Sequence, residues 1–274
     1  MGLTPAIQPD VRSEANPRAA VAEMTAKSDS DLAREAMAGR FGETVFLADW
    51  VEMTFLHFRV EEERLAKWTR FTPDRFEGEC YVSLVSFTMN RLRFFRGGAL
   101  TRWMTLPLSS HRFLNLRTYV RHQGESGILF LSEWLNHRLA VALGPRTFGL
   151  PYQLAKIDSK FDPQESEAQV ETREDRLGFR AVATEPPRSV SPETRDYFLL
   201  ERYSAFTEAG RRPKQFRVWH PSWKVSPTTE VEWEDRSLLE HSGGDLFEDA
   251  EFVGGHLTTG LEDVWMGRPH PVQI

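Results

Sequence analysis

One run of residues, 79–95 (ECYVSLVSFTMNRLRFF), restricts the fold of this chain more than any other. Side chains of an extended strand point alternately to opposite faces, which places Val85 and Phe87 on one face and Leu84 on the other. Both faces stay mostly uncharged until Arg91. A strand that is apolar on both faces has to be buried on both, so we expect a sheet that is covered on two sides or closed on itself.

The rest of the chain is also rich in predicted strands. Runs of large apolar and β-branched residues predict strands at 45–60, 112–122, 127–135, 151–161, 167–173, 176–183, 215–220 and 223–233. Short helices are predicted at 61–68, at 30–40 with Ser30 or Asp31 as cap, at 136–143 ended by Gly144 and Pro145, and at 191–203 opened by Ser191. Many strands without a strand–helix rhythm predict a mainly β (α+β) fold, an antiparallel β-barrel with a few short helices.

Changes in composition along the chain suggest three parts. Residues 1–42 read as a disordered N-terminal arm with a short helix, because the first 28 residues are rich in Ala, Pro and charge. Residues 43–240 form the single barrel domain. Residues 241–274 are rich in Gly, Asp and Glu, and we predict a mobile C-terminal tail there.

The overall composition argues against several classes of partner. A net charge of −6 does not suit a protein that binds nucleic acid through a basic face. No stretch approaches the roughly 20 apolar residues that span a bilayer, and Pro5, Pro9 and Asp10 interrupt any secretory signal. The single cysteine, Cys80, fits a reducing compartment. We therefore expect no nucleic acid, no membrane and a cytoplasmic location.

Metal and cofactor motifs are missing from the sequence as well. The eight histidines are scattered without a His-x-His or His-x-x-x-His pair, and there is no second thiol. No phosphate-binding glycine loop or nucleophile elbow occurs. No metal and no cofactor are expected, and the oligomeric state stays open, a homo-oligomer included.

Four motifs in series carry a resemblance to a known family. They are 113–121 (FLNLRTYVR), 130–134 (FLSEW) followed by 138–141 (RLAV), 149–152 (GLPY), and 201–203 (ERY) followed by 220–223 (HPSW). Their order and spacing resemble the uncharacterised YqjF-like family, domain of unknown function 2071, over about residues 46–233. That family looks like a branch of the acetoacetate decarboxylase-like superfamily. The resemblance implies an antiparallel β-barrel that encloses a pocket.

The same resemblance raises a chemical question about lysine. Acetoacetate decarboxylases carry a Gly-aromatic-Pro-Lys-Lys segment in which one lysine attacks a ketone. Aligning 149–151 with it places Tyr152 and Gln153 at the lysine positions, and neither side chain can form a Schiff base. Lys156 is the obvious substitute because an extended chain would turn it to the face of Tyr152, at a Cα distance of about 13 Å. The alternative is a lysine at a strand end that reaches solvent.

Polar residues in the first two motifs are further candidates. Asn115 and Arg117 share one side of their strand, and an arginine pointing into a barrel would clamp a carboxylate; the alternative is an outer polar face. Glu133 lies among large apolar residues, so it is either paired, with Arg138 or Arg117 as partner, or an acid–base group with a raised pKa. Relatives often have an acid where this chain has Phe113, which makes the expected cavity more apolar.

The last motif supplies Tyr203, His220 and Trp223, which would either contact a ligand or hold local structure. The leading hypothesis is a small-molecule binding protein whose barrel holds an apolar ligand or an organic acid, the acid bound by Arg117 or Arg138. The first alternative is an enzyme that acts on keto-acid-like or enolisable substrates through Glu133. The second is a protein interaction module, which predicts a filled barrel and an exposed aromatic patch.

Overall fold

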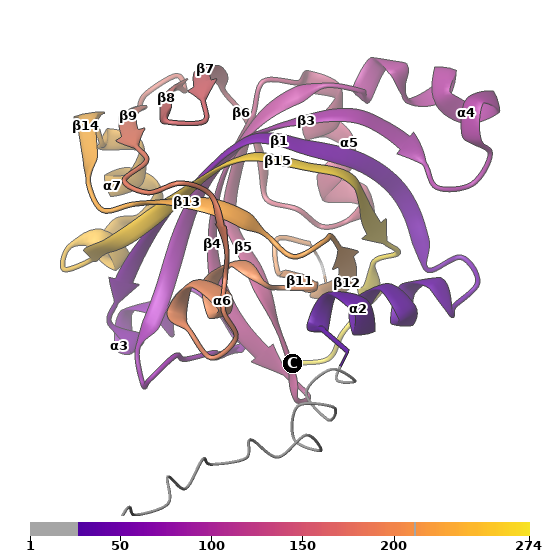
Figure 1. Ribbon diagram of the computed structural model, residues 1–274, viewed down its shortest axis with the longest axis horizontal. Coiled ribbons are helices and arrows are strands. Elements are labelled where there is room, and N and C mark those ends of the chain that lie inside the picture. Colours follow the sequence, from indigo (N-terminus) through magenta and orange to yellow (C-terminus); the bar gives the residue numbers. More distant parts are fainter. Residues whose placement is uncertain (1–26, 211) are drawn as a thin grey trace, which may run out of the picture.

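The computed structural model describes residues 27–210 and 212–274, and these fold around one closed β-barrel (Figure 1). The helices are α2 (Asp29–Ala38), α3 (Glu62–Leu65), α4 (Gly98–Thr105), η1 (Leu106–Leu108), α5 (Arg138–Thr147), α6 (Arg195–Leu200), α7 (Ser237–Gly243) and η2 (Gly244–Phe247). The strands of the larger sheet are β1 (Thr44–Val60), β2 (Thr72–Pro73), β3 (Cys80–Phe94), β4 (His111–His122), β5 (Glu125–Leu135), β6 (Tyr152–Leu154), β10 (Arg188–Ser189), β11 (Ser204–Thr207), β12 (Lys214–Trp219), β13 (Lys224–Thr228), β15 (Glu251–Gly267) and β16 (His270–Pro271). Four more strands form a second sheet: β7 (Lys156–Asp162), β8 (Glu165–Glu171), β9 (Arg176–Val182) and β14 (Val231–Asp235).

Seven strands close the barrel in the order β15, β1, β3, β4, β5, β11 and β12, with β12 pairing back onto β15. All neighbours are antiparallel except β5 and β11, which run parallel. The predicted barrel is therefore confirmed, and the sheet is mixed at that one pair. The short strand β6 lies parallel to the outer end of β5 and adds the segment that follows α5.

The two apolar faces of β3 have different neighbours. Leu84 on the outer face belongs to a core cluster that also contains Leu116 of β4 and Phe179 of the four-stranded sheet. That smaller sheet lies over the outside of the barrel (Figure 1). Val85 and Phe87, on the opposite face, point into the barrel and line its cavity. The sheet is thus both closed and covered, which explains why β3 carries so little charge.

The C-terminal residues do not form the mobile tail that the sequence predicted. Residues 251–267 are β15, a 17-residue strand that pairs with β1 along almost its whole length and completes the barrel. Gly260, which looked like a loop residue, has a φ of +107°, and a Cβ there would overlap the carbonyl oxygen of Trp50. The glycines of this segment permit close approach to β1, while Leu257 and Val264 supply its buried contacts. The prediction for 241–274 is wrong for this reason.

Several helix boundaries also differ from the sequence prediction. Helix α6 begins at Arg195 with Thr194 as its cap, not at Ser191, and α3 ends at Leu65. Ser28, not Ser30 or Asp31, caps α2, in a capping box with Asp31; Ser30 is buried and its Oγ donates to the carbonyl of His220 at 2.7 Å. Helix α5 continues through Gly144 to Thr147, because the N–H groups of residues 148 and 149 bond to the Gly144 carbonyl. Gly144 is required for packing, since a Cβ there would overlap the ring of Tyr152.

The predicted disorder of the first 28 residues concerns mainly residues 1–26, which lie outside the described part of the chain. Among residues 27–210 and 212–274, every helix is too short or too polar to cross a membrane.

Candidate functional site

The barrel encloses a cavity of about 240 Å³ whose walls are mainly aromatic and aliphatic. Trp50 and Phe55 of β1 and Phe87 of β3 form much of one wall, and Phe130 and Phe216 form part of another. Helix α5 contributes Leu143 and Gly144 from one end. A small pocket with apolar walls and few polar groups is the usual form of a small-molecule site.

Three polar side chains form a row across neighbouring strands in this cavity. Asn115 of β4 is paired with Glu133 of β5, and Glu133 is paired with Tyr152 of β6. All three residues line the cavity. A register shift between Leu116 and Arg117 turns both Phe130 and Glu133 of β5 inward, although three positions separate them. The bulge therefore adds an acid to a wall that is otherwise apolar.

Glu133 is buried without a counter-ion. Its residue is 3% exposed, its Oε2 has no hydrogen-bond partner, and it forms no ion pair with any residue described. Burial raises the pKa of Glu133 well above that of an ordinary carboxyl group. Burial and the neighbouring Glu133 also raise the pKa of Tyr152. The expected ion pair with Arg117 or Arg138 is absent from the described part of the chain, and the raised pKa favours the protonated form of Glu133, which can donate a hydrogen bond.

Arg117 points into the barrel rather than onto an outer polar face. Its residue is 8% exposed, and its guanidinium carbon lies 5.4 Å from the ring centroid of Phe55. Nη2 donates to the carbonyl of Leu199 at 3.3 Å, whereas Nε has no partner. No acidic side chain among residues 27–210 and 212–274 forms an ion pair with it. Arg121, four positions further along β4, is instead exposed and pairs with Asp74 at 3.0 Å.

His220 and Trp223 line the cavity but use their polar atoms on the backbone. His220 Nδ1 donates to the carbonyl of Pro221 at 2.8 Å, and Trp223 Nε1 donates to the carbonyl of Leu200 at 3.1 Å. Burial lowers the pKa of His220 to about 4, so the ring is neutral at pH 7. Tyr203 lies behind this wall: its ring stacks on His220 at a centroid distance of 4.7 Å. Its hydroxyl donates to Glu201.

Lys156 and Arg138 lie outside the cavity. Lys156 is exposed, and its Nζ lies 3.8 Å from Glu171 Oε2 on the four-stranded sheet. The chain leaves the barrel after β6, so Tyr152 and Lys156 belong to different sheets and not to one extended face. Arg138 is exposed at the first position of α5. Among the cavity-lining residues described, none is a lysine.

The comparison with known families agrees with this architecture. A model of DUF2071, described as an uncharacterized conserved protein, matches residues 47–260. The chain belongs to this family. The uncharacterized protein YqjF of Bacillus subtilis is 29% identical to this chain over 182 residues. The aligned region covers 64% of this chain and 72% of YqjF.

Solved structures with acetoacetate decarboxylase-like folds resemble the DUF2071 barrel. The enduracididine biosynthesis enzyme MppR complexed with pyruvate is 13% identical with a TM-score of 0.60, covering 83% of this chain and 89% of MppR. Acetoacetate decarboxylase from Legionella pneumophila is 12% identical with a TM-score of 0.57, covering 83% of this chain and 87% of that enzyme. At these identities the likeness shows the fold alone.

Two polar residues of the DUF2071 cavity were not singled out from the sequence. Arg202 lines the cavity, and its place in the ERY motif was the available signal. His111, at the start of β4, also lines it; its Nδ1 is buried without a partner, and burial lowers its pKa to about 4. Within the described residues, no group of three His, Cys, Asp or Glu side chains is arranged to hold a metal ion.

Proposed function

We propose that this DUF2071 protein binds a small organic acid inside its barrel and that no Schiff base forms there. One observation carries the proposal: Arg117 is a buried arginine that lines an apolar cavity, retains an unpartnered Nε, and has no carboxylate partner in the described chain. A buried charge is costly unless it is paired, and a carboxylate matches the guanidinium in both charge and geometry. The ligand would supply the missing counter-ion.

The walls support an apolar body for this ligand. A cavity of about 240 Å³ is below the range of about 300–1,000 Å³ typical of drug-sized pockets, which favours an acid of few carbon atoms. The aromatic walls would bury its hydrocarbon part. At the row on β4, β5 and β6, Asn115 Oδ1 and Glu133 Oε2 remain available for a polar group of the ligand.

The absence of imine chemistry rests on the side chain at position 152. Tyr152 lines the cavity where the resemblance to decarboxylases places a lysine, and a phenol cannot form an iminium. Lys156, the alternative amine, is exposed on the second sheet. Borohydride treatment in the presence of pyruvate should leave the mass of the protein unchanged. A reduced adduct on Lys156 would restore imine chemistry.

Binding can be tested with hexanoate and its neutral analogue hexan-1-ol. Isothermal titration calorimetry should show binding of hexanoate, and Arg117→Met should weaken it by about tenfold or more, because the carboxylate loses its charged partner. Arg138→Met is the matched control, since this arginine is exposed outside the barrel. Equal affinity of the Arg117→Met variant and the wild type for hexanoate would remove the basis of the proposal.

An acid–base enzyme for keto-acid-like or enolisable substrates is the second candidate. The observation in its favour is Glu133, a carboxyl group of raised pKa in the cavity beside Tyr152. A group with a pKa shifted toward neutrality suits proton transfer next to a carbonyl. Exchange of the methyl protons of pyruvate with deuterium, followed by proton NMR, tests this activity. Exchange that persists in Glu133→Gln would exclude this residue as the base.

A protein interaction module is the weakest of the three hypotheses. It predicted a filled barrel, whereas the barrel contains a cavity with polar groups directed into it.

A further inference from the structure

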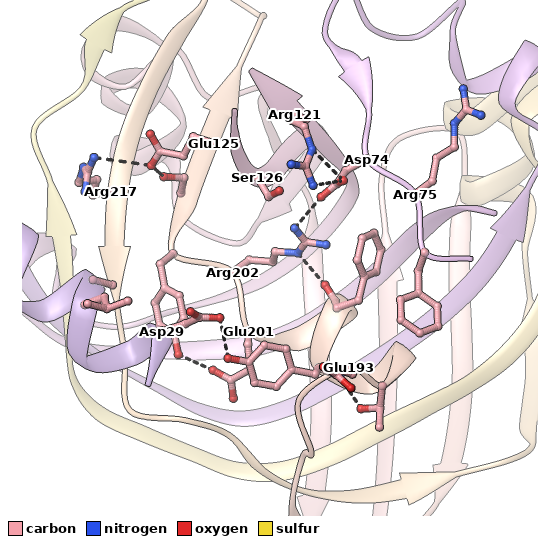
Figure 2. Close-up of a pocket in the computed structure, with 18 of the residues that line it drawn as sticks. Asp29, Asp74, Arg75, Arg121, Glu125, Ser126, Glu193, Glu201, Arg202 and Arg217 are labelled. Carbon is pink, nitrogen blue, oxygen red and sulfur yellow. Dashed lines mark hydrogen bonds and ion pairs between the residues drawn. The ribbon is translucent and has the colours of Figure 1, made fainter. Parts of the chain in front are cut away.

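A second hollow of about 670 Å³ lies on the surface next to the cavity and shares a wall with it. This groove is bordered by α2, by the turn between β4 and β5, and by α6. Figure 2 shows Arg202 near its centre, with Asp74 beside it. Arg202 lines the groove and also the cavity inside the barrel. Its side chain therefore separates the interior of the barrel from the surface groove.

The guanidinium of Arg202 is held firmly but not completely satisfied. Nη1 donates to Asp74 Oδ2 at 2.8 Å, and Nε donates to the carbonyl of Phe198 at 2.6 Å. The guanidinium carbon lies 4.0 Å from the ring centroid of Phe198. The side chain is only 8% exposed, and its Nη2 is buried without a partner. These contacts fix the orientation of Arg202 and leave the N–H groups of Nη2 available.

Arg202 and Arg117 are close enough to affect one another. Burial lowers the pKa of Arg202, Asp74 opposes this effect, and the charge of Arg117 lowers it further. Both side chains line the cavity, and both retain a buried nitrogen without a hydrogen-bond partner. Two buried guanidinium groups that have spare donors and line the same apolar cavity form a site for an anion.

The charged groups around Arg117 and Arg202 select the kind of anion. Asp74 offsets one of the two arginines, and it also contacts Arg121, which is exposed to solvent. Glu201 belongs to the groove, where its carboxylate accepts from the hydroxyl of Tyr203 and the backbone N–H of residue 223. The cavity histidines His111 and His220 are neutral near pH 7, and burial raises the pKa of Glu133 and so favours its uncharged form. Arg117, Arg202 and Asp74 taken together carry one net positive charge, which a single carboxylate neutralises.

We propose that Arg202 is a second ligand-binding residue and that the cavity takes a monocarboxylate, whose carboxylate group lies between Arg117 and Arg202. This inference rests on the proposed binding of an organic acid and names the class of acid and the second residue that holds it. Dicarboxylates and phosphate monoesters bind less tightly, because their second charge would have to be buried without a partner.

Calorimetric titration with hexanoate, adipate and hexyl phosphate tests the inference on the full-length protein. The wild type should bind hexanoate about tenfold or more tightly than either dianion. Arg202→Met should weaken hexanoate binding by about tenfold or more, and Arg202→Lys less, because lysine keeps the charge but loses the planar fork. Arg121→Met is the matched control: it contacts the same Asp74 but does not line the cavity, so hexanoate affinity should stay within about twofold.

A further variant keeps Arg202, so that the charge argument can be tested even if the Arg202 variants fail to fold. Asp74→Asn removes the charge that offsets Arg202, so adipate binding should improve relative to hexanoate. Wild-type affinity of Arg202→Met for hexanoate, together with weak binding by Arg117→Met, would refute the role of Arg202 and leave the proposed function standing. Failure of the wild-type protein to bind any of the three acids would refute both. Equal affinity for hexanoate and adipate would refute the charge argument.

Discussion

The neutral state of Glu133 leads to a prediction about stability and pH. Folding buries this carboxyl group without a counter-ion, and its pKa is raised well above the usual 4.5. The unfolded chain loses this proton as the pH rises above 4.5, while the folded protein keeps it. The contribution of Glu133 to stability is therefore fully present at pH values below 4.5 and is lost progressively as the pH rises. Glu133→Gln, which cannot ionise, should not show this loss.

The size of the effect follows from the number of protons involved. One proton held by the folded state and released by the unfolded state lowers the free energy of unfolding by about 1.4 kcal/mol per pH unit. The free energy of unfolding of the wild type should fall by up to this amount per pH unit relative to Glu133→Gln, over the pH range in which the folded protein keeps the proton and the unfolded chain has lost it. Near pH 5 the fall is smaller, because part of the unfolded chain is still protonated there.

Urea unfolding followed by tryptophan fluorescence at several pH values measures this difference. Wild-type and Glu133→Gln proteins are compared at each pH, so that effects of all other titrating groups cancel in the difference. Glu171→Gln, at an exposed position of β8, is the control and should follow the wild type. A difference between wild type and Glu133→Gln that stays constant from pH 5 to pH 6.5 would show that Glu133 ionises normally in the folded protein, and the argument for a neutral acid would fail.

Three further predictions follow from other parts of the barrel. Burial lowers the pKa of His220 to about 4. As the pH falls from 7 to 5, the free energy of unfolding of the wild type, measured by urea unfolding, should therefore fall by about 2 kcal/mol relative to that of His220→Gln. Gly144→Ala normally stabilises a helix by about 1 kcal/mol, but here the added Cβ overlaps the Tyr152 ring, so a lower melting temperature and weaker hexanoate binding are expected. Removal of residues 251–274 deletes β15 and should abolish cooperative unfolding in calorimetry, because β1 and β12 lose a partner strand; a sharp transition in the truncated protein would contradict this.

The strand pattern was sufficient to predict the barrel because burial on two faces leaves a clear signal. β3 has apolar residues on its inner and outer faces, and the structure provides a cavity for one and a second sheet for the other. The C-terminal strand β15 gave no such signal. Its glycines are needed for close packing against β1, yet glycines and acidic residues in a short sequence resemble a loop. Pairing with the distant strand β1 determines that this segment is a strand, and a local sequence pattern carries no information about such pairing.

The candidate site could be predicted only in part for a related reason. Strict alternation places Asn115 and Arg117 on one face, and both do line the cavity. The same rule applied to residues 152–156 turned Lys156 to the face of Tyr152, and it failed because the chain passes from one sheet to the other at Ala155. Arg202 follows a helix rather than lying within a strand, so no periodicity indicated its direction.

Two kinds of polar group line the cavity. Arg117 and Arg202 provide positive charge, and Glu133 and Tyr152, whose pKa values are raised, provide hydrogen-bonding groups. An ionised Glu133 would repel a carboxylate, and an acidic partner for Arg117 would cancel its charge; the raised pKa of Glu133 and the unpaired Arg117 therefore both favour the proposed organic acid. In the proposed complex the carboxylate of the ligand would contact the arginines, and a carbonyl or hydroxyl group would contact Glu133. These polar contacts would give the ligand a single orientation, which the apolar walls alone would not impose.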